Sequence, residues 1–136
     1  LWRLGMSTLR TNALEGMDAK NSITIVAGAG NVTTTNMQEG LLKQWCNIKG
    51  TTTTEFLDSF NTSSLIDSAT GKTYVYFTND MNNALYSITT SAQENTCVHA
   101  HSAVNAGSYQ AQSRGSDDQA FTDVTHFGCQ IAGDLA

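Results

Sequence analysis

Apolar residues near the beginning of the chain recur every three to four positions, the spacing of one face of an α-helix. The residues with this spacing are Trp2, Met6, Leu9, Ala13 and Met17. They predict a helix over residues 2–19. The β-branched stretch from Ile23 to Val26 follows and predicts a short strand.

A second helical pattern begins at Asn36, a residue type that caps helices well, with Glu39 three positions later as in a capping box. The apolar residues that continue the pattern are Met37, Leu41, Trp45 and Ile48. Gly50 is expected to end this helix. Residues 54–60 then predict one or two further helical turns.

Residues 74–89 carry the clearest β pattern. Tyr74–Thr78 and Ala84–Thr89 are rich in aromatic and β-branched residues, and turn-forming residues separate them. They predict an antiparallel hairpin. Residues 108–120 are polar and predict irregular structure, whereas the alternation from Phe121 to Phe127 predicts a final strand.

The stretch "ENTCVHAHSAVNAG" contains one cysteine and two histidines, which are candidate metal-binding or catalytic residues. Ser91 and Glu94 form another capping box, and Gly107 ends the stretch, so the pattern predicts a helix over residues 92–105. On a helix, His99 and His101 are about 200° apart and could not bind one metal ion, whereas on a strand they would share a face. We therefore predict no metal site here.

Together these elements predict an α+β fold, with residues 1–136 forming a single globular domain. The N-terminal helix is expected to pack on a mainly antiparallel sheet, with two shorter helices nearby. Its apolar face is expected to contact Val75, Phe77 or Leu85, or the opposite face of the same hairpin.

The composition changes the range of possible functions. Only 14% of the residues are charged, while Ser, Thr and Asn account for 42 of 136 positions. Such an uncharged polar surface is typical of exported, surface or fibrous proteins. The net charge is −5 and the seven basic residues are scattered, which excludes a nucleic-acid-binding surface. No apolar stretch approaches the roughly 20 residues of a transmembrane helix.

Motifs for catalysis or cofactor binding are absent from the sequence. It contains no Gly-x-Ser-x-Gly, and "GAGNVT" lacks both the third glycine and the downstream acidic residue of a dinucleotide-binding loop. We predict a non-catalytic protein without a cofactor. Three cysteines, Cys46, Cys97 and Cys129, allow one disulfide and one remaining thiol.

One part of the sequence resembles the type IVb pilins and related minor pilins. In that family a strand ending in an Ile-Thr-like pair leads into a helix that carries the first disulfide cysteine, and the second cysteine lies near the C-terminus. "LYSITTSAQENTCVHAHSAVNAG" resembles this arrangement, with Ile88 and Thr89 closing the strand and Cys97 on the helix. "FTDVTHFGCQIAGDLA" would supply the partner, Cys129, and "TGKTYVYFTNDMNNALYSIT" the entering hairpin.

The resemblance covers residues 70–129 best and implies several further properties. It implies a disulfide between Cys97 and Cys129, with Cys46 either a core residue or a competing disulfide partner. It implies a structural subunit, major or minor, of an extracellular pilus-like fibre (a fimbrium) on the bacterial cell surface, which supports adhesion or assembly. Its partners would be other pilin subunits and a host-cell or surface receptor, and a hydrophobic N-terminal segment, absent here, would provide the only membrane contact.

Two other function classes stay open at this point. The first is a secreted adhesin or lectin-like binding module, which would need the same polar surface but no fibre. The second is a small secreted hydrolase or metal enzyme that uses His99, His101 or His126.

Overall fold

The computed structural model describes residue 11 and residues 24–26, 34–36, 40–93, 96–115, 117 and 120–136, with the backbone alone described in 24–26, 34–36 and 96–102. Within this part of the chain every element is a strand. The chain divides into two compact units, Leu1–Gln38 and Glu39–Ala136. The prediction of a single globular domain stays a prediction.

In the first unit, the described strands are β1 (Thr24–Val26) and β2 (Thr34–Asn36), which pair antiparallel. The strand predicted from Ile23 to Val26 is thereby confirmed over Thr24–Val26. The helix predicted over residues 2–19 lies outside the described residues, apart from Thr11, which is not helical.

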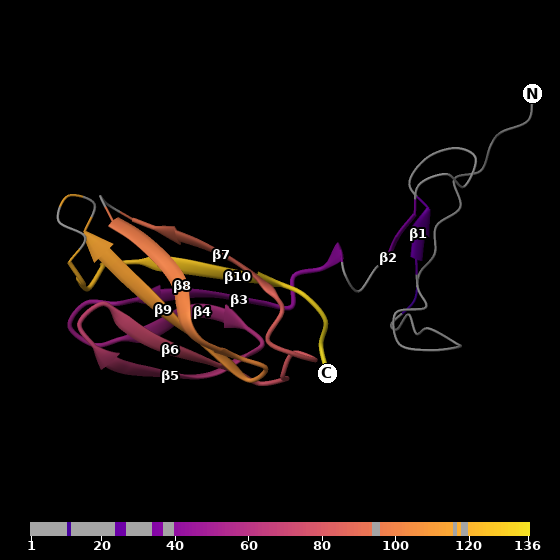
Figure 1. Cartoon of the computed structure of the whole chain (residues 1–136), viewed down its shortest axis with the longest axis horizontal. Coiled ribbons are helices and arrows are strands. Elements are labelled where there is room, and N and C mark those ends of the chain that lie inside the picture. Colours follow the sequence, from indigo (N-terminus) through magenta and orange to yellow (C-terminus); the bar gives the residue numbers. More distant parts are fainter. Residues whose placement is uncertain are drawn as a thin grey trace, which may run out of the picture. The chain divides into compact units, whose positions relative to one another are not determined.

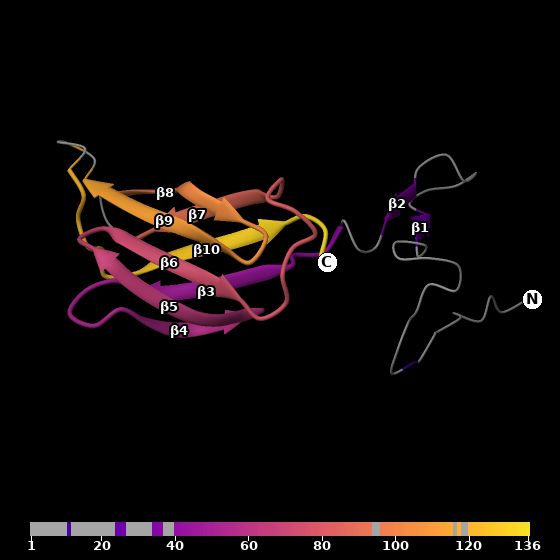
Figure 2. The same ribbon diagram turned by 60° about the horizontal axis from the view of Figure 1, so that its bottom comes forward.

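The second unit contains eight strands, arranged as two four-stranded antiparallel sheets that form a β-sandwich (Figures 1 and 2). The strands of the first sheet, in spatial order, are β4 (Glu55–Phe60), β3 (Gln44–Lys49), β10 (Phe127–Ala132) and β7 (Ser87–Ala92). Those of the second are β5 (Thr62–Ala69), β6 (Lys72–Phe77), β9 (Ser108–Gly115) and β8 (Thr96–Asn105). We call them the β3–β10 sheet and the β6–β9 sheet.

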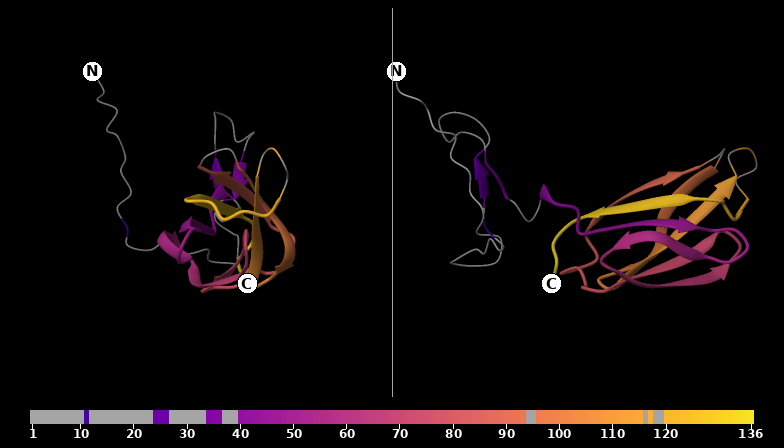
Figure 3. Two further views of the ribbon diagram at one scale, coloured as in Figure 1. Left: turned by 90° about the vertical axis from the view of Figure 1, so that its left-hand side faces the viewer. Right: turned by 180° about the vertical axis from the view of Figure 1, so that it is seen from behind.

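The strands nearest the two ends of this unit lie side by side. β10 pairs antiparallel with β3 on one side and with β7 on the other (Figure 3). The consecutive strands β4 and β5 lie at an edge of different sheets, as do β7 and β8. Each of these two connections therefore carries the chain from one sheet to the other.

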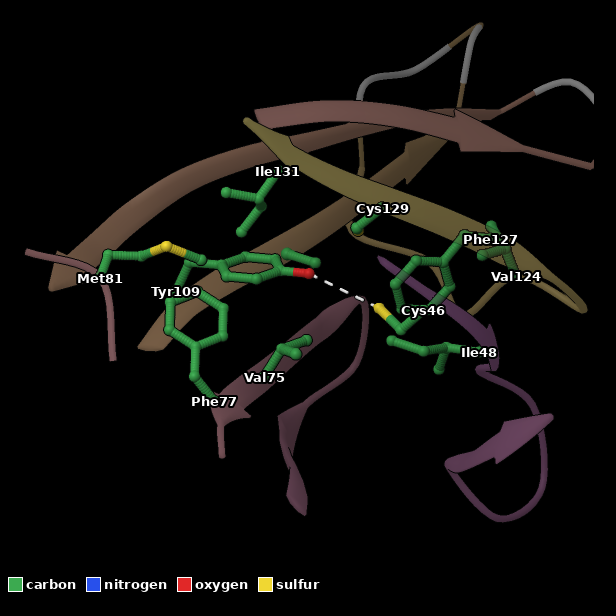
Figure 4. Packing of buried hydrophobic residues seen from close by; sticks show 11 residues of the cluster. Cys46, Ile48, Val75, Phe77, Met81, Tyr109, Val124, Phe127, Cys129 and Ile131 are labelled. Carbon is green, nitrogen blue, oxygen red and sulfur yellow. Dashed lines mark hydrogen bonds between the residues drawn. The ribbon is translucent and has the colours of Figure 1, made fainter. Parts of the chain in front are cut away.

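The core lies between the two sheets, because inward-facing side chains alternate with outward-facing ones along the central strands. From the β3–β10 sheet the buried core residues are Cys46, Ile48, Phe127, Cys129 and Ile131. From the β6–β9 sheet they are Val75, Phe77, Tyr109 and Ala111, and Met81 and Val124 come from connecting segments (Figure 4). The core thus draws on both sheets about equally.

The predicted α+β fold is wrong, because the described part of the chain is all-β and no helix packs on either sheet. Val75 and Phe77 are buried against the opposite sheet, and Leu85 is 92% exposed. The described residues include no helix that is long and apolar enough to cross a membrane.

The short predicted helices are strands. The helix predicted from Asn36 is replaced from Gln44 onward by β3, and the helical turns predicted over residues 54–60 are β4. The helix predicted over residues 92–105 is β8 from Thr96 to Asn105. In each case a tertiary partner strand is hydrogen-bonded alongside, and this pairing outweighs the local helical signal.

The predicted strands are confirmed only in part, because their pairing or their boundaries differ in the structure. The strand predicted at Tyr74–Thr78 is confirmed as β6, but β7 lies in the other sheet, so the predicted hairpin is wrong. Residues 108–115 form the central strand β9 where irregular structure was predicted. The final strand was predicted over residues 121–127, but β10 covers Phe127–Ala132, so the two share only Phe127.

Candidate functional site

The outer face of the β3–β10 sheet carries two aligned rows of side chains. In the first row, Phe60, Trp45, Gln130 and Thr89 stand opposite one another on the four strands. In the second row, two positions further along, stand Asp58, Asn47, Gly128 and Ser91. Because side chains alternate across a strand, the same face holds both rows.

Gly128 produces a hollow at the middle of the second row. It has no side chain, while its neighbours Asn47 and Ser91 project from the adjoining strands. A groove of about 330 Å³ opens here, and its lining residues are Trp45, Cys46, Asn47, Thr89, Thr90, Ser91, Gly128, Cys129 and Gln130. A Cβ at position 128 would lie 3.0 Å from the Oγ atom of Ser91, so even a methyl group would narrow it.

The hollow continues toward one end of the sheet. A second depression of about 330 Å³ shares Asn47, Ser91 and Gly128 with the first, and it extends to Gln93 and His126. There the Nδ1 atom of His126 hydrogen-bonds the side-chain oxygen of Gln93 at 2.5 Å. We call the two depressions together the outer groove.

The outer groove is polar but carries no carboxylate or ammonium group in its lining. The amides of Asn47 and Gln130 and the hydroxyls of Thr89 and Ser91 are exposed, and they make no side-chain hydrogen bond to another described residue. Trp45 provides a half-buried aromatic surface beside them. Amide and hydroxyl groups both donate and accept, so the site suits a neutral ligand rich in hydroxyl groups.

A buried polar cluster lies on the inner side of the same strands. Cys46 and Cys129 face each other across β3 and β10 and are 3% and 1% exposed. The hydroxyl of Tyr109 lies 3.6 Å from the Sγ atom of Cys46 and donates to the side-chain oxygen of Gln44 at 3.5 Å. Gln44 in turn donates to the hydroxyl of Thr62 at 3.4 Å.

The proximity of the two thiols changes how readily each loses its proton. A hydrogen bond from Cys129 lowers the pKa of Cys46 to about 7, although burial opposes this. The same hydrogen bond and burial raise the pKa of Cys129. Burial also raises the pKa of Tyr109, so its hydroxyl stays protonated and can donate to Gln44.

The structure separates most of the residues that the sequence singled out. His126 lies in the outer groove, whereas His99 and His101 are on β8 of the other sheet and their side chains are outside the described ones. Cys97 is also on β8 with an undescribed side chain, so its pairing with Cys129 stays a prediction. What the structure does bring together is Cys129 and Cys46.

The described residues contain no group of three or more His, Cys, Asp or Glu side chains that could hold a metal ion. The sequence patterns do not identify the groove residues Trp45 and Gly128 as site residues. The helical spacing places Trp45 on the buried face of a helix, and no local pattern reveals its outward position, because the polar Gln44 beside it is the buried residue.

The fold and this groove define an antiparallel β-sandwich with an aromatic and polar groove, lined by no carboxylate or ammonium group, on one outer face. The chain matches no family model, no curated protein and no solved structure.

Proposed function

We propose that this protein is an extracellular, non-catalytic, lectin-like binding module whose outer groove holds a neutral saccharide. The single observation that carries the proposal is the composition of the groove: the half-buried indole of Trp45 beside exposed amides and hydroxyls, with no carboxylate or ammonium group in the lining. The low content of charged residues in the whole chain agrees with an extracellular surface.

The chemistry of sugars matches this combination of groups. The face of an aromatic ring is electron-rich and attracts the weakly positive C–H groups on one face of a pyranose. The hydroxyl groups around the sugar both donate and accept hydrogen bonds, as the side chains of Asn47, Gln130, Thr89 and Ser91 do. A rigid sheet also holds these side chains at fixed spacing, which limits the entropy lost on binding.

An array of neutral and acidic oligosaccharides tests the proposal, followed by calorimetry with the best-bound neutral sugar. Trp45→Ala is expected to weaken binding at least tenfold, because it removes the aromatic surface. Tyr74→Ala is the matched control, since Tyr74 is a half-buried aromatic residue on β6 of the other sheet. Its affinity is expected to equal that of the wild type.

Three results would overturn this function. They are the absence of binding to any oligosaccharide, a preference for acidic sugars, and a Trp45→Ala variant that is folded but binds like the wild type. Circular dichroism of each variant shows whether the fold is retained.

A fibre subunit that supports adhesion or assembly is the second candidate, and a different observation favours it. The consecutive edge strands β4 and β5 carry exposed apolar side chains: Leu57, Phe60 and Ile66 are 49%, 54% and 50% exposed. Edge strands with exposed apolar residues are prone to pair with another chain. This role would not require the pilin fold, because exposed edge strands are also present in the β-sandwich.

Sedimentation of the wild type across a concentration series tests the fibre role. The double variant Leu57→Ser, Phe60→Ser is expected to reduce self-association. Leu85→Ser is the control, because Leu85 is 92% exposed but lies between strands β6 and β7. A wild-type protein that is monomeric at all concentrations would contradict this candidate.

A further inference from the structure

We propose that Cys46 and Cys129 form a disulfide that joins β3 to β10 when the protein meets a disulfide-containing oxidant. This inference concerns a covalent cross-link and does not depend on the ligand of the outer groove. It assigns Cys129 a partner on a strand that pairs with its own.

The position of the two cysteines in the sheet is the first argument. Cys46 and Cys129 are directly opposite each other in the antiparallel pairing of β3 and β10. The Cα atoms of directly opposite residues lie about 4.5 or 5.5 Å apart, depending on the type of pair. Both separations fall within the range of about 4.4–6.8 Å that a disulfide spans.

The direction of the two side chains is the second argument. Both cysteines belong to the inward-facing set of their strands and are buried, so both side chains lie in the layer between the two sheets (Figure 4). Both are free thiols in this structure, and each shifts the pKa of the other, an effect of close neighbours. A bond between the two sulfur atoms is therefore compatible with the observed pairing of the strands.

The reaction balances with a disulfide donor such as glutathione disulfide or an oxidised thiol–disulfide oxidoreductase. The thiolate of Cys46 attacks one sulfur of the donor, which releases one donor thiol and leaves a mixed disulfide. The thiolate of Cys129 then attacks the Cys46 sulfur and displaces the second donor thiol. The protein loses two electrons and two protons, and the donor is reduced to two thiols.

Burial determines when this exchange takes place. With side chains 3% and 1% exposed, neither thiol is accessible to a donor in the closed sandwich. The exchange therefore takes place during folding or in a locally opened state. Once formed, the disulfide is enclosed by the core and is expected to resist reduction until the protein unfolds.

The positions of Lys and Arg allow a direct test by peptide mapping. Cleavage after these residues places the three cysteines in separate peptides: residues 44–49, 73–114 and 115–136. The whole chain is refolded with reduced and oxidised glutathione, its free thiols are blocked under denaturing conditions, and the digest is analysed without reductant. We expect a cross-link between peptides 44–49 and 115–136, with Cys97 blocked as a free thiol.

Two variants and a stability measurement complete the test. Cys97→Ser is expected to keep the cross-link, and Cys46→Ser to abolish every cross-link within the chain. Reduction is expected to lower the thermal midpoint of the wild type by more than about 10 °C, because the disulfide closes a long loop in the unfolded chain. A cross-link that contains Cys97, or three blocked thiols after oxidation, would overturn the proposal.

Discussion

The hydroxyl of Tyr109, on β9, lies 3.6 Å from the Sγ atom of Cys46, on β3, so one side chain spans the interior between the two sheets. The same hydroxyl donates to the side-chain oxygen of Gln44. Both partners are buried, and a buried polar group that lost its hydrogen bond would cost free energy. Polar contacts therefore join the two sheets in the middle of an otherwise apolar core.

Replacing Tyr109 by Phe tests the value of these contacts. The variant keeps the ring but removes the donor to Gln44, so the free energy of unfolding at pH 7 is expected to fall by about 1–2 kcal/mol. Urea denaturation at pH 7 measures the difference. A variant as stable as the wild type would show that the hydroxyl contributes nothing.

The same residue predicts a dependence of stability on alkaline pH. Burial raises the pKa of Tyr109 above the ordinary value, so the folded state holds this proton more tightly than the unfolded state. Its contribution is complete below the unfolded pKa of about 10 and is lost as the pH rises above that value. Between pH 9 and 11 the wild type is therefore expected to lose more stability than Tyr109→Phe.

Tyr86 offers a second position for comparison. Burial raises the pKa of Tyr86 to about 12, and its hydroxyl donates to the backbone oxygens of Asn105 and Ser108. Its contribution is expected to disappear as the pH rises from about 10 to about 12. Thermal melts across this range should show a shallower decline in Tyr86→Phe, and parallel curves would contradict the prediction.

Asn61 forms the corner at which the chain leaves β4 for β5. Its φ angle is 54°, in the left-handed region. Its side-chain amide donates to the backbone oxygens of Lys43 and Asn79 at 3.0 Å, and its side-chain oxygen accepts from the backbone nitrogen of Asn79 at 2.7 Å. Asn61→Ala is expected to destabilise the protein by about 2 kcal/mol or more, since alanine forms none of these side-chain hydrogen bonds and tolerates the left-handed conformation less well. Asn61→Gly should cost less in the same denaturation experiment, because glycine tolerates the left-handed conformation.

Gly71, in the turn between β5 and β6, cannot carry a side chain without strain. Its φ is 65°, and an added Cβ would lie 2.5 Å from the backbone oxygen of Ser113. Gly71→Ala is expected to cost about 2 kcal/mol or more. Gly107→Ala is the control, because the atom that its Cβ would meet belongs to the side chain of Asp80, which can move. Equal thermal midpoints for the two variants would contradict this account.

Gly128→Val tests the groove independently of Trp45. The new side chain would occupy the hollow, and its Cβ would meet the exposed hydroxyl of Ser91, which can rotate away. Valine also suits a strand. The thermal midpoint is therefore expected to change by only a few degrees, while saccharide affinity falls at least tenfold; unchanged affinity would place the ligand elsewhere.

The sequence by itself determined the polar, weakly charged surface and one central strand, β6. In β6 the buried residues Thr73, Val75 and Phe77 alternate with Tyr74 and Tyr76. This alternation predicts a strand without any knowledge of the strands that pair with it. The surface composition follows from counting residues and needs no fold.

Only the tertiary structure decided the conformation of β3. Gln44 is fully buried while the larger, apolar Trp45 lies on the outer face, so the polar and apolar positions are reversed relative to the usual pattern. The reversal is stable because Tyr109 and Thr62, distant in sequence, bind the Gln44 amide. Without these partners, the spacing of Leu41, Trp45 and Ile48 suggested a helix.

The sequence did not predict the central strand β9, for the same physical reason. Gln110 and Gln112 are nearly fully buried, and the amide nitrogen of Gln112 donates to the side-chain oxygen of Gln110 at 2.8 Å. A polar segment is stable in the middle of a sheet once its polar groups are hydrogen-bonded, but the local sequence does not show whether those hydrogen bonds can form. The pairing of Cys46 with Cys129 and the hollow at Gly128 depend likewise on β3, β10 and β7 lying side by side, which only the assembled sheet brings about.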